Sequence, residues 1–206
     1  DEYATLEVFL SNPSKAWELY RALGKILQGK KPGKAHKALS ALEDLGLLEG
    51  IVTQNVDNLH QCAGSKTVFE IHGDHHRLQC LECGMLEAVD ERVLKEEDIP
   101  RCSGCGFPMK PNVVLFGEPV RRIGEIDAFL ADCDLLLVIG TSAQVYPAAG
   151  IPHQVKRNNG VIMEFNREPV LGLDHFTGIS TMTDYFFHGD VEHTLPDFYQ
   201  SVKQSS

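Results

Sequence analysis

Apolar side chains recur at helical spacing near the start of the chain, and residues 1–48 are predicted to be helical. The turn Asn12-Pro13-Ser14 predicts the start of one helix. A break at residues 30–34 precedes a second helix over about residues 36–45. The apolar positions that define the first helix are Trp17, Leu19, Tyr20, Leu23 and Ile26.

Strands and helices alternate from residue 113 onward, after a short apolar strand over residues 50–55. This alternation predicts an α/β sheet with right-handed crossovers. Residues 134–139, Asp-Leu-Leu-Leu-Val-Ile, predict a strand buried on both faces, as parallel strands are. Cys133, just before it, is expected to be a small core residue. Further strands are predicted at residues 161–166 and 185–188, and helices at residues 148–157 and 190–202.

The acidic composition limits the partners that the chain can bind. Its 206 residues include 19 Lys and Arg against 29 Asp and Glu, a formal net charge of −10. Direct binding to nucleic acid or to an anionic membrane is therefore not expected. No apolar run approaches the roughly 20 residues of a membrane-spanning helix, and the first residues lack the features of a secretory signal. We expect a cytoplasmic protein with reduced thiols.

Four cysteines form the strongest spacing pattern in the chain. Cys80 and Cys83 make one Cys-x-x-Cys pair, and Cys102 and Cys105 make another after 18 intervening residues. Four thiolates are a tetrahedral zinc donor set that leaves no position for water, so we expect one structural Zn²⁺. The ion would replace the core that residues 74–112 lack. The alternative is two redox disulfides or unrelated buried cysteines.

Polar residues follow the ends of the predicted strands, where ligands bind in open α/β sheets. They lie at residues 53–55, 140–142 and 166–168. His72 is a candidate base near neutral pH, although a histidine before glycine is more often a turn residue. The turn at residues 140–142 could take a phosphate or ribose, or could cap a helix. Glu168 could bind a ribose diol or be a solvated charge.

Six motifs occur in an order that resembles the sirtuins, which are NAD-dependent protein-lysine deacylases. They are TQNVDNLH at 53–60, IHG at 71–73, the two Cys-x-x-Cys pairs, VVLFGE at 113–118, GTSAQVYP at 140–147 and FNREP at 165–169. The resemblance covers essentially the whole chain. It implies a Rossmann-like NAD-binding domain and a small domain, with NAD and an acyl-lysine peptide in the cleft between them. The Rossmann-like domain would comprise residues 37–73 and 113–206, and the small domain a helical module at 1–36 and a zinc-ribbon module at 74–112.

The resemblance also implies a role for each motif. His72 resembles the general base, and Asn55 and Asp57 resemble the nicotinamide and ribose contacts, with Gln54 beside them. The residues on the adenosine side of the cofactor would be Gly140, Thr141, Ser142, Asn166, Glu168 and, through its backbone, Val191. The segment that would pair with the substrate backbone contributes Val113, Val114, Phe116, Gly117 and Glu118, with Phe116 over the acyl chain.

The implied reaction joins the acyl oxygen of the modified lysine to the anomeric carbon of NAD as nicotinamide leaves. His72 then takes a proton from a ribose hydroxyl, whose oxygen attacks the bound acyl carbon. The products would be deacylated lysine, nicotinamide and O-acyl-ADP-ribose. Such a reaction needs positioning and a site that excludes water, and the zinc ion takes no part in it.

Two departures from the family pattern bear on activity and on substrate. The family begins with a strand and a glycine-rich phosphate loop, and no Gly-x-Gly-x-x-Gly occurs in this sequence. We expect the chain to be a fragment of an enzyme; the alternative is a natural short form with a binding role. Acid-acyl-selective relatives carry Tyr-x-x-Arg where this chain has Tyr20-Arg21-Ala22-Leu23, so a neutral acyl group such as acetyl is expected, with Arg21 facing elsewhere.

Two other functions compete with a protein deacetylase. A non-catalytic binding module would take acyl-lysine or ADP-ribose without turnover. A mono-ADP-ribosyltransferase would use the same NAD pocket but would label an acceptor without needing an acylated peptide.

Overall fold

The computed structural model describes residues 4–89, 93, 98–172 and 180–205. The modules predicted from the sequence also include residues outside these ranges, at both ends and in three internal gaps. The chain forms two compact units, between which it passes five times. Unit 1 comprises Asp1–Lys31, Thr53–Leu59 and Glu70–Arg121, and unit 2 comprises Pro32–Val52, His60–Phe69 and Arg122–Ser206. The division into modules at residues 36, 73 and 112 stays a prediction.

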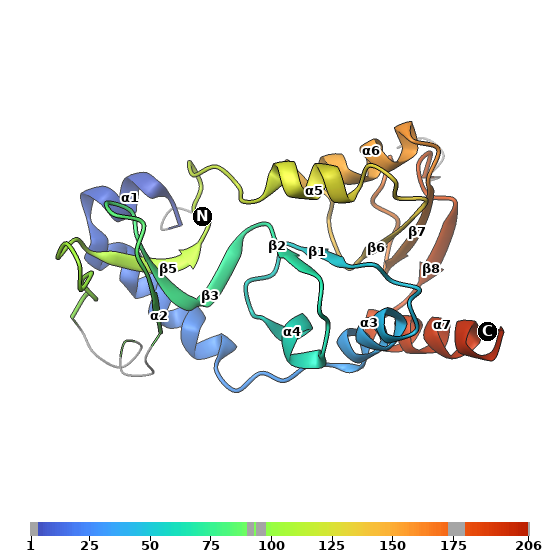
Figure 1. Cartoon of the computed structure of the whole chain (residues 1–206), viewed down its shortest axis with the longest axis horizontal. Coiled ribbons are helices and arrows are strands. Elements are labelled where there is room, and N and C mark those ends of the chain that lie inside the picture. Colours follow the sequence, from blue (N-terminus) through green and yellow to red (C-terminus); the bar gives the residue numbers. More distant parts are fainter. Residues whose placement is uncertain (1–3, 90–92, 94–97, 173–179, 206) are drawn as a thin grey trace. The chain divides into compact units, whose positions relative to one another are not determined.

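Unit 1 combines two helices with an antiparallel sheet (Figure 1). The helices are α1 (Leu6–Ser11) and α2 (Pro13–Leu27), and the sheet has the order β4 (Leu86–Ala88), β3 (Gly73–Cys80), β5 (Met109–Val113). As predicted, α2 starts at the turn around Asn12, whose side chain accepts a hydrogen bond from the N–H of Lys15 at 3.2 Å.

Helices and sheet share one hydrophobic core in unit 1. Its members come from α1, α2, the cysteine-rich segment and the residues just after it: Phe9, Ala16, Trp17, Tyr20, Leu78, Cys80, Cys102, Met109 and Leu115. The segment at residues 74–112 is poor in large apolar side chains. Its buried residues pack in the same core as the apolar face of the helices.

Unit 2 is built on a parallel sheet with the order β6 (Leu135–Ile139), β7 (Val161–Asn166), β8 (Tyr185–His188). Helices α3 (Lys34–Asp44) and α7 (Val191–Ser205) pack against each other and supply core residues to one face of the sheet (Figure 1). Among its described residues the unit also contains α5 (Ile123–Phe129), the 3-10 turn η2 (Ala148–Gly150), α6 (Ile151–Arg157) and most of α4 (Leu59–Ala63). This is the Rossmann-like arrangement of parallel strands and helices that was predicted.

Strands β1 (Ile51–Thr53) and β2 (Val68–Glu70) pair with each other, and α4 (Leu59–Ala63) lies between them in sequence. The N–H of Ile51 donates to the carbonyl of Thr67 at 2.9 Å, and the N–H of Ile71 donates to the carbonyl of Thr53 at 3.1 Å. The segments that follow β1 and β2, with Asn55 and His72, are thereby brought alongside each other.

Several predicted elements differ from the structure for identifiable reasons. The second helix begins at Lys34 rather than at residue 36 because Glu192 accepts hydrogen bonds from the N–H groups of Lys34 at 2.7 Å and Ala35 at 3.3 Å. The helix predicted over residues 148–157 starts as a 3-10 turn and becomes α-helical at Ile151.

The expectation of a strand buried on both faces was wrong for β6. Val138 is buried, but Leu135 is 42% exposed. Within the part of the chain that the structure describes, β6 is the outermost strand and pairs only with β7. Cys133 is half-buried rather than a core residue, and its thiol lies 3.4 Å from the carbonyl of Leu135. None of the described helices is both long and apolar enough to span a bilayer.

Candidate functional site

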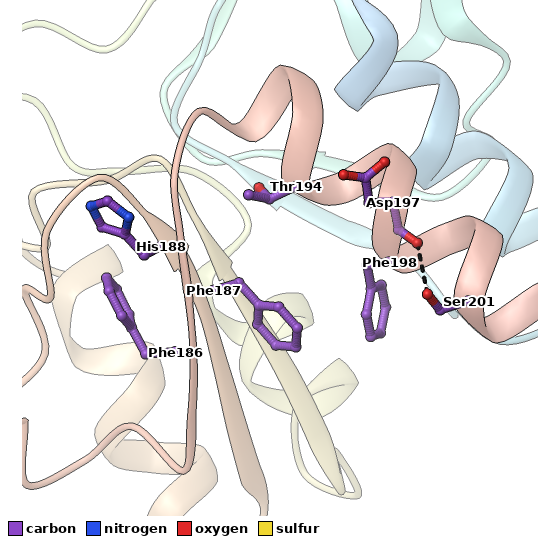
Figure 2. Close-up of a pocket in the computed structure, with 7 residues that line it drawn as sticks. All are labelled: Phe186, Phe187, His188, Thr194, Asp197, Phe198 and Ser201. Carbon is purple, nitrogen blue, oxygen red and sulfur yellow. Dashed lines mark hydrogen bonds between the residues drawn. The ribbon is translucent and has the colours of Figure 1, made fainter.

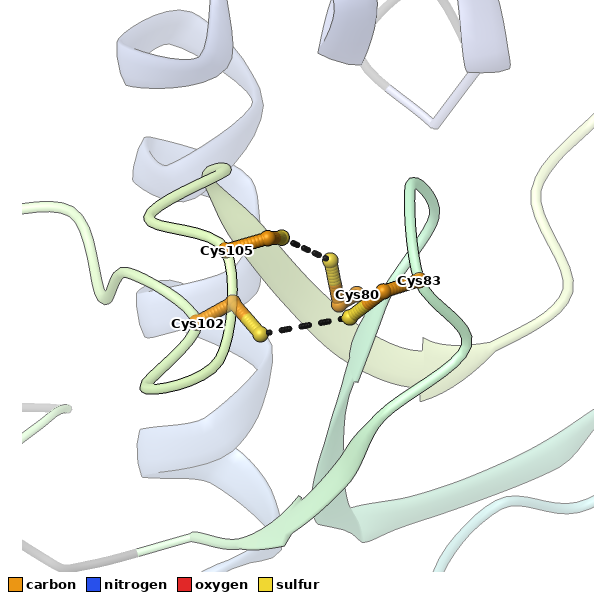
Figure 3. A group of neighbouring side chains, drawn as sticks. All are labelled: Cys80, Cys83, Cys102 and Cys105. Carbon is orange, nitrogen blue, oxygen red and sulfur yellow. Dashed lines mark hydrogen bonds between the residues drawn. The ribbon is translucent and has the colours of Figure 1, made fainter.

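The four predicted metal ligands converge in unit 1 (Figure 3). The Sγ atoms of Cys80 and Cys105 are 3.5 Å apart, as are those of Cys83 and Cys102, and all four lie within 4.8 Å of one another. A tetrahedral zinc ion with Zn–S bonds of about 2.3 Å needs sulfur atoms about 3.8 Å apart. All four cysteines are free thiols, so the cluster is consistent with one structural zinc ion and not with two disulfides.

Each zinc knuckle is a tight turn closed by a glycine. The N–H of Gly84 donates to the carbonyl of Cys80 at 3.0 Å, and that of Gly106 donates to the carbonyl of Cys102 at 2.9 Å. Both glycines have a φ of +74°, which side chains disfavour. Burial acts to raise the pKa of Cys80, but the backbone N–H of Cys83 and neighbouring thiols lower it to about 7. A thiol that ionises near neutral pH is ready to bind a metal.

His72 is fixed in one tautomer. Its Nδ1 lies 3.1 Å from the backbone carbonyl oxygen of Gln54. A carbonyl oxygen can only accept, so Nδ1 carries the proton and the lone pair remains on Nε2. The backbone carbonyl of His72 also accepts from the N–H of Val114 at 2.8 Å. His72 is half-buried, with its ring oriented by Gln54 and its backbone held by Val114, and the ring can accept a proton at Nε2.

The polar segment after β1 lies beside His72 within unit 1. The backbone of His75 donates to the carbonyl of Val56 at 3.0 Å, which extends the contact made by Gln54. Asn55 is exposed, and its N–H donates to Thr53 Oγ1 at 3.1 Å. Asp57 Oδ1 accepts from the N–H of Leu59 at 3.0 Å, at the start of α4. The structure thus brings together Gln54, Asn55, Asp57 and His72, as expected for one group of site residues.

The predicted substrate-pairing segment, Val113 to Glu118, is already paired along part of its length. The N–H of Phe116 donates to the carbonyl of Ala4, and the N–H of Leu6 donates to the carbonyl of Phe116, both at 3.0 Å. Among the described residues no backbone hydrogen bond involves Gly117, whose φ is +96°. Phe116 is 59% exposed. Gly117 is thus left without a backbone partner within the described ranges, and pairing of this segment with a substrate peptide stays a prediction.

A buried ion pair holds this segment in shape. Lys110 is fully buried; its Nζ lies 2.9 Å from Glu118 Oε2 and donates to the carbonyl of Val113 at 2.6 Å. The same Glu118 oxygen accepts from the N–H of Leu115 at 2.9 Å. Burial lowers the pKa of Lys110, and the charge of Glu118 opposes that shift. Lys110 was not identified from the sequence, although a lysine close before the apolar motif at 113–118 can indicate a buried charge.

The expected adenosine-side residues form a second group, in unit 2, at the carboxyl ends of β6, β7 and β8. The Asn166 side chain donates to the carbonyl of Thr141 at 2.8 Å, which ties the ends of β6 and β7 together. Gly140 has a φ of +58°, and a Cβ there would lie 3.9 Å from Val191 Cγ1. Ser142 and Glu168 are exposed in the same region. Thr141 Oγ1 accepts from the N–H of Ala143 at 3.0 Å and the next helical residue is Ala148, so the helix-capping alternative is wrong.

Comparison with known proteins identifies the family. The family model described as Sir2 family matches residues 1–147. An NAD-dependent protein deacylase of Pyrococcus abyssi is 42% identical over 213 residues, which cover 99% of this chain and 81% of that protein. An NAD-dependent protein deacetylase of Sulfolobus acidocaldarius is 45% identical over 172 residues, 81% of this chain and 67% of that protein. The chain belongs to the Sir2 family. The sirtuin resemblance of its motifs is thereby confirmed.

Solved Sir2 structures are similar over nearly the whole chain. A complex of a Sir2 homologue with NAD has a TM-score of 0.89 at 31% identity and covers 99% of this chain and 77% of that one. A complex of Sir2 with a p53 peptide and NAD⁺ has a TM-score of 0.83 at 30% identity and covers 98% of this chain and 81% of that one. The two groups of site residues therefore belong to a fold that, in these relatives, binds NAD and a peptide.

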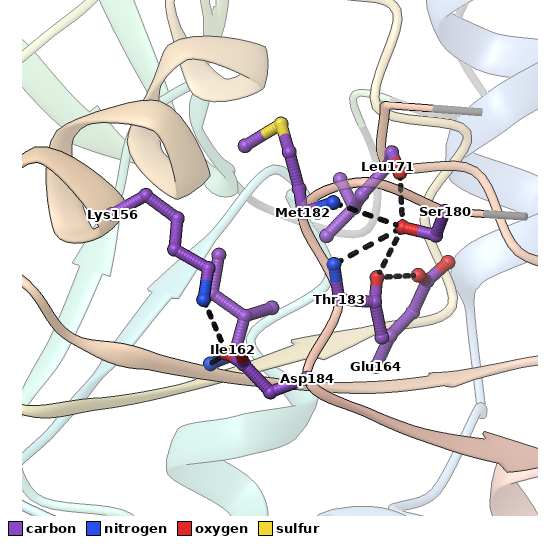
Figure 4. A network of polar contacts seen from close by, with 8 residues as sticks. All are labelled: Lys156, Ile162, Glu164, Leu171, Ser180, Met182, Thr183 and Asp184. Carbon is purple, nitrogen blue, oxygen red and sulfur yellow. Dashed lines mark hydrogen bonds and ion pairs between the residues drawn. The ribbon is translucent and has the colours of Figure 1, made fainter. Parts of the chain in front are cut away.

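One more buried polar group of this Sir2 chain was not identified from the sequence. Glu164, on β7, is fully buried, and its Oε1 accepts from the N–H of Val170 at 2.7 Å. Its Oε2 accepts from Thr183 Oγ1 at 2.6 Å (Figure 4). Ser180 lies 2.9 Å from Thr183 Oγ1 and contacts the carbonyl of Leu171. This network holds together the two ends of the connection between β7 and β8, just beyond Asn166 and Glu168.

Unit 2 also carries an open pocket of about 470 Å³ between β8 and α7 (Figure 2). Its walls include the aromatic rings of Phe186 and Phe198, together with His188 and Asp197. None of the site residues predicted from the sequence lines it.

Proposed function

We propose that the chain acts as an NAD-dependent protein-lysine deacylase that prefers acetyl groups. The observation that carries the proposal is the orientation of His72, whose Nδ1–H is held by the carbonyl of Gln54 so that Nε2 is free to accept a proton. Family membership, and the names of relatives that are 42% and 45% identical, support the same activity.

His72 acts as the general base at Nε2. NAD supplies the anomeric carbon, to which the acyl oxygen bonds as nicotinamide leaves. It also supplies the ribose hydroxyl that receives the acyl group. His72 takes the proton of that hydroxyl, so that its oxygen can attack the acyl carbon, and Asn55 and Asp57 contact nicotinamide and ribose on the same side. One water molecule adds to the acyl carbon and the lysine amine leaves it. The products are deacylated lysine, nicotinamide and O-acyl-ADP-ribose.

The substrate peptide pairs with the backbone of Gly117, in the segment that Lys110 and Glu118 hold rigid. Phe116, which is largely exposed, covers the acyl chain and excludes water from it. Val114 and Val113, the last residue of β5, belong to the same segment. A neutral acyl group is favoured because Leu23, on α2, places no cation where an acidic acyl group would need one.

The adenosine part of NAD contacts the strand ends of unit 2. The exposed hydroxyl of Ser142 and the exposed carboxylate of Glu168 bind ribose, and the turn Gly140-Thr141 approaches the cofactor with its backbone. The backbone of Val191 meets the adenine. Asn166 keeps this turn in place through its hydrogen bond to Thr141. Ligand contacts at the carboxyl ends of parallel strands are the rule in open α/β sheets.

The test uses the full chain with NAD and an acetyl-lysine peptide, and follows peptide mass, nicotinamide and O-acetyl-ADP-ribose together. We expect equal amounts of deacetylated peptide and nicotinamide, and no nicotinamide release with the same peptide unmodified. ADP-ribose attached to an acceptor without acylated peptide would identify a transferase instead. Peptide binding by calorimetry without nicotinamide release would identify a binding module.

A further inference from the structure

The strand that follows His72 carries a large bulge. Strand β3 pairs with β5 at Gly73 opposite Val113 and again at Leu78 opposite Pro111. Four residues of β3, Asp74 to Arg77, therefore face a single residue of β5, Asn112. Bulges of this kind re-aim the neighbouring side chains and are common beside active sites. Because the backbone ladder is interrupted here, something else must hold the bulge in its conformation.

Backbone hydrogen bonds from outside β5 fix His75 and His76, and side chains provide the rest of that support. Asp74 is 1% exposed, and its Oδ2 accepts from Asn112 Nδ2 at 2.6 Å and from Arg77 Nη2 at 2.7 Å. Its other oxygen accepts from the N–H of His76 at 3.1 Å. Asn112 is 2% exposed, and its Oδ1 accepts from Arg121 Nη1. Every side-chain polar atom of the buried Asp74–Asn112 pair therefore has a specific partner.

The network reaches the backbone on both sides of His72. The N–H of Arg121 donates to the carbonyl of Ile71 at 3.2 Å. Asn112 precedes the strand residue that faces Gly73, and a Cβ on Gly73 would lie 2.0 Å from the Asn112 carbonyl oxygen. The backbone around His72 is thus held by Arg121 on the Ile71 side and lies against Asn112 on the Gly73 side. Asp74 fixes the N–H of His76 in the bulge that follows.

We infer that Asp74 and Asn112 are positioning residues for the base His72, acting through the bulge and not by contact with substrate. The inference rests on the proposed function for its kinetic consequence. It predicts that deacetylation needs one carboxylate and one amide at these two positions. Which position holds which group should matter little.

The test is a reciprocal exchange of the two side chains. Asp74→Asn sets an amide NH₂ against either Asn112 or the N–H of His76, so one donor loses its acceptor. Asn112→Asp sets two buried carboxylates against each other. The double variant Asp74→Asn/Asn112→Asp restores one donor and one acceptor, and keeps an acceptor for Arg121. Arg77 loses its partner in the double variant, but its side chain is 51% exposed and can be hydrated.

Two rates separate positioning of the base from general damage. Exchange of labelled nicotinamide into NAD reports the first step, which does not need the proton transfer, and single-turnover deacetylation reports the step that does. We expect each single variant to lower deacetylation by about tenfold or more with exchange largely retained, and the double variant to recover most of the loss. Asp44→Asn, at an exposed carboxylate in unit 2, is the matched control and should change neither rate.

Wild-type deacetylation in both single variants would overturn the inference. So would an equal loss of both rates that the exchange of side chains does not repair, because that pattern describes a purely structural role. A wild-type chain without deacetylase activity would refute the proposed function instead. Amide hydrogen exchange of the ligand-free protein then decides the inference: protection at Val114 and Arg121 must fall in the single variants and return in the double variant.

Discussion

The indole Nε1 of Trp17 donates to the backbone carbonyl of Met109 at 2.8 Å, which joins helix α2 to the strand that follows the second zinc knuckle. Trp17 is 1% exposed and is the only tryptophan of the chain. Its fluorescence therefore reports the packing of unit 1, where helices and zinc-ribbon residues share a core.

Removal of zinc should unfold unit 1 and expose Trp17. The cysteine-rich segment has little core of its own, so metal binding contributes directly to the folding free energy. We expect a strong chelator to release one zinc ion per chain, lower the melting temperature and shift Trp17 emission to longer wavelength. Cys80→Ser should do the same without chelator. Cys62→Ser, at an exposed cysteine outside the cluster, is the control and should leave all three readouts unchanged. Folded protein with zinc content near zero would contradict the assignment.

Replacement of Leu23 by arginine should change the acyl preference. Leu23 is 47% exposed on α2, one turn after Tyr20, whose hydroxyl is buried without a hydrogen-bond partner in the described structure. A guanidinium at residue 23 offers a bidentate partner to the carboxylate of a succinyl group. We expect Leu23→Arg to raise kcat/KM for a succinyl-lysine peptide by about tenfold or more, the value of one charge-assisted contact, and to lower it for the acetyl peptide.

Ala22→Arg is the matched control for this change. It adds the same charge at the adjacent exposed position, which points to another side of the helix. The native Arg21 already faces elsewhere: its guanidinium lies 5.3 Å from the Trp17 ring centroid and donates to the carbonyl of Asp98. If both variants gain succinyl activity equally, overall charge and not the position of residue 23 sets the preference.

Loss of the His72 side chain should stop deacetylation without abolishing the first step. General bases contribute about 10²- to 10⁴-fold to a rate, and nicotinamide exchange does not need the proton that Nε2 accepts. We expect His72→Ala to lower deacetylation by at least about 100-fold while labelled nicotinamide still exchanges into NAD. His153→Ala, on α6, should keep both rates. Deacetylation at the wild-type rate in His72→Ala would remove His72 from the base role.

Local patterns predicted much of this fold because the signals for strands and for zinc are local. The strands at residues 161–166 and 185–188 have the predicted bounds, and the two Cys-x-x-Cys pairs converge as their spacing requires. The start of α3 was misplaced because its capping group, Glu192, lies 158 residues away from Lys34 in sequence.

The supports of the site are the part that the sequence did not predict. Asp74 and Asn112 are 38 residues apart, and nothing in their neighbours indicates that each is buried against the other. Their pairing depends on the register between β3 and β5, which includes a bulge. The length of that bulge cannot be predicted from the hydrophobic pattern. Motifs identify the residues that face a ligand, whereas the residues that hold them in place become visible only in three dimensions.

Asp74 should make the stability of unit 1 sensitive to acid. Burial acts to raise the pKa of Asp74, but hydrogen bonds from Arg77 and Asn112 and the charge of Arg77 outweigh it, so the pKa lies below its usual value. Such a carboxylate stabilises the fold fully above its unfolded pKa of about 3.9, and the contribution disappears as pH falls through the lower folded pKa. The free energy of unfolding, measured in urea by Trp17 emission, should therefore fall below about pH 4. Asp74→Asn should make this free energy depend less on pH in the acid range. An identical pH slope in both proteins would contradict the assigned shift.

Glu164 should stabilise unit 2 through its two acceptor oxygens and not through its charge. Glu164→Leu leaves the N–H of Val170 without an acceptor and removes one of the two partners of the Thr183 hydroxyl, and a buried unsatisfied donor costs about 1–3 kcal/mol. In Glu164→Gln, Oε1 can still accept from Val170, while Thr183 can turn its hydroxyl toward Ser180 and accept from the new amide. We therefore expect urea unfolding to show a loss of about 2 kcal/mol or more in the leucine variant and under about 1 kcal/mol in the glutamine variant. Glu125→Gln, at an exposed carboxylate on α5, is the control. Equal losses in the glutamine and leucine variants would mean that the negative charge itself, and not the two hydrogen bonds, stabilises the connection between β7 and β8.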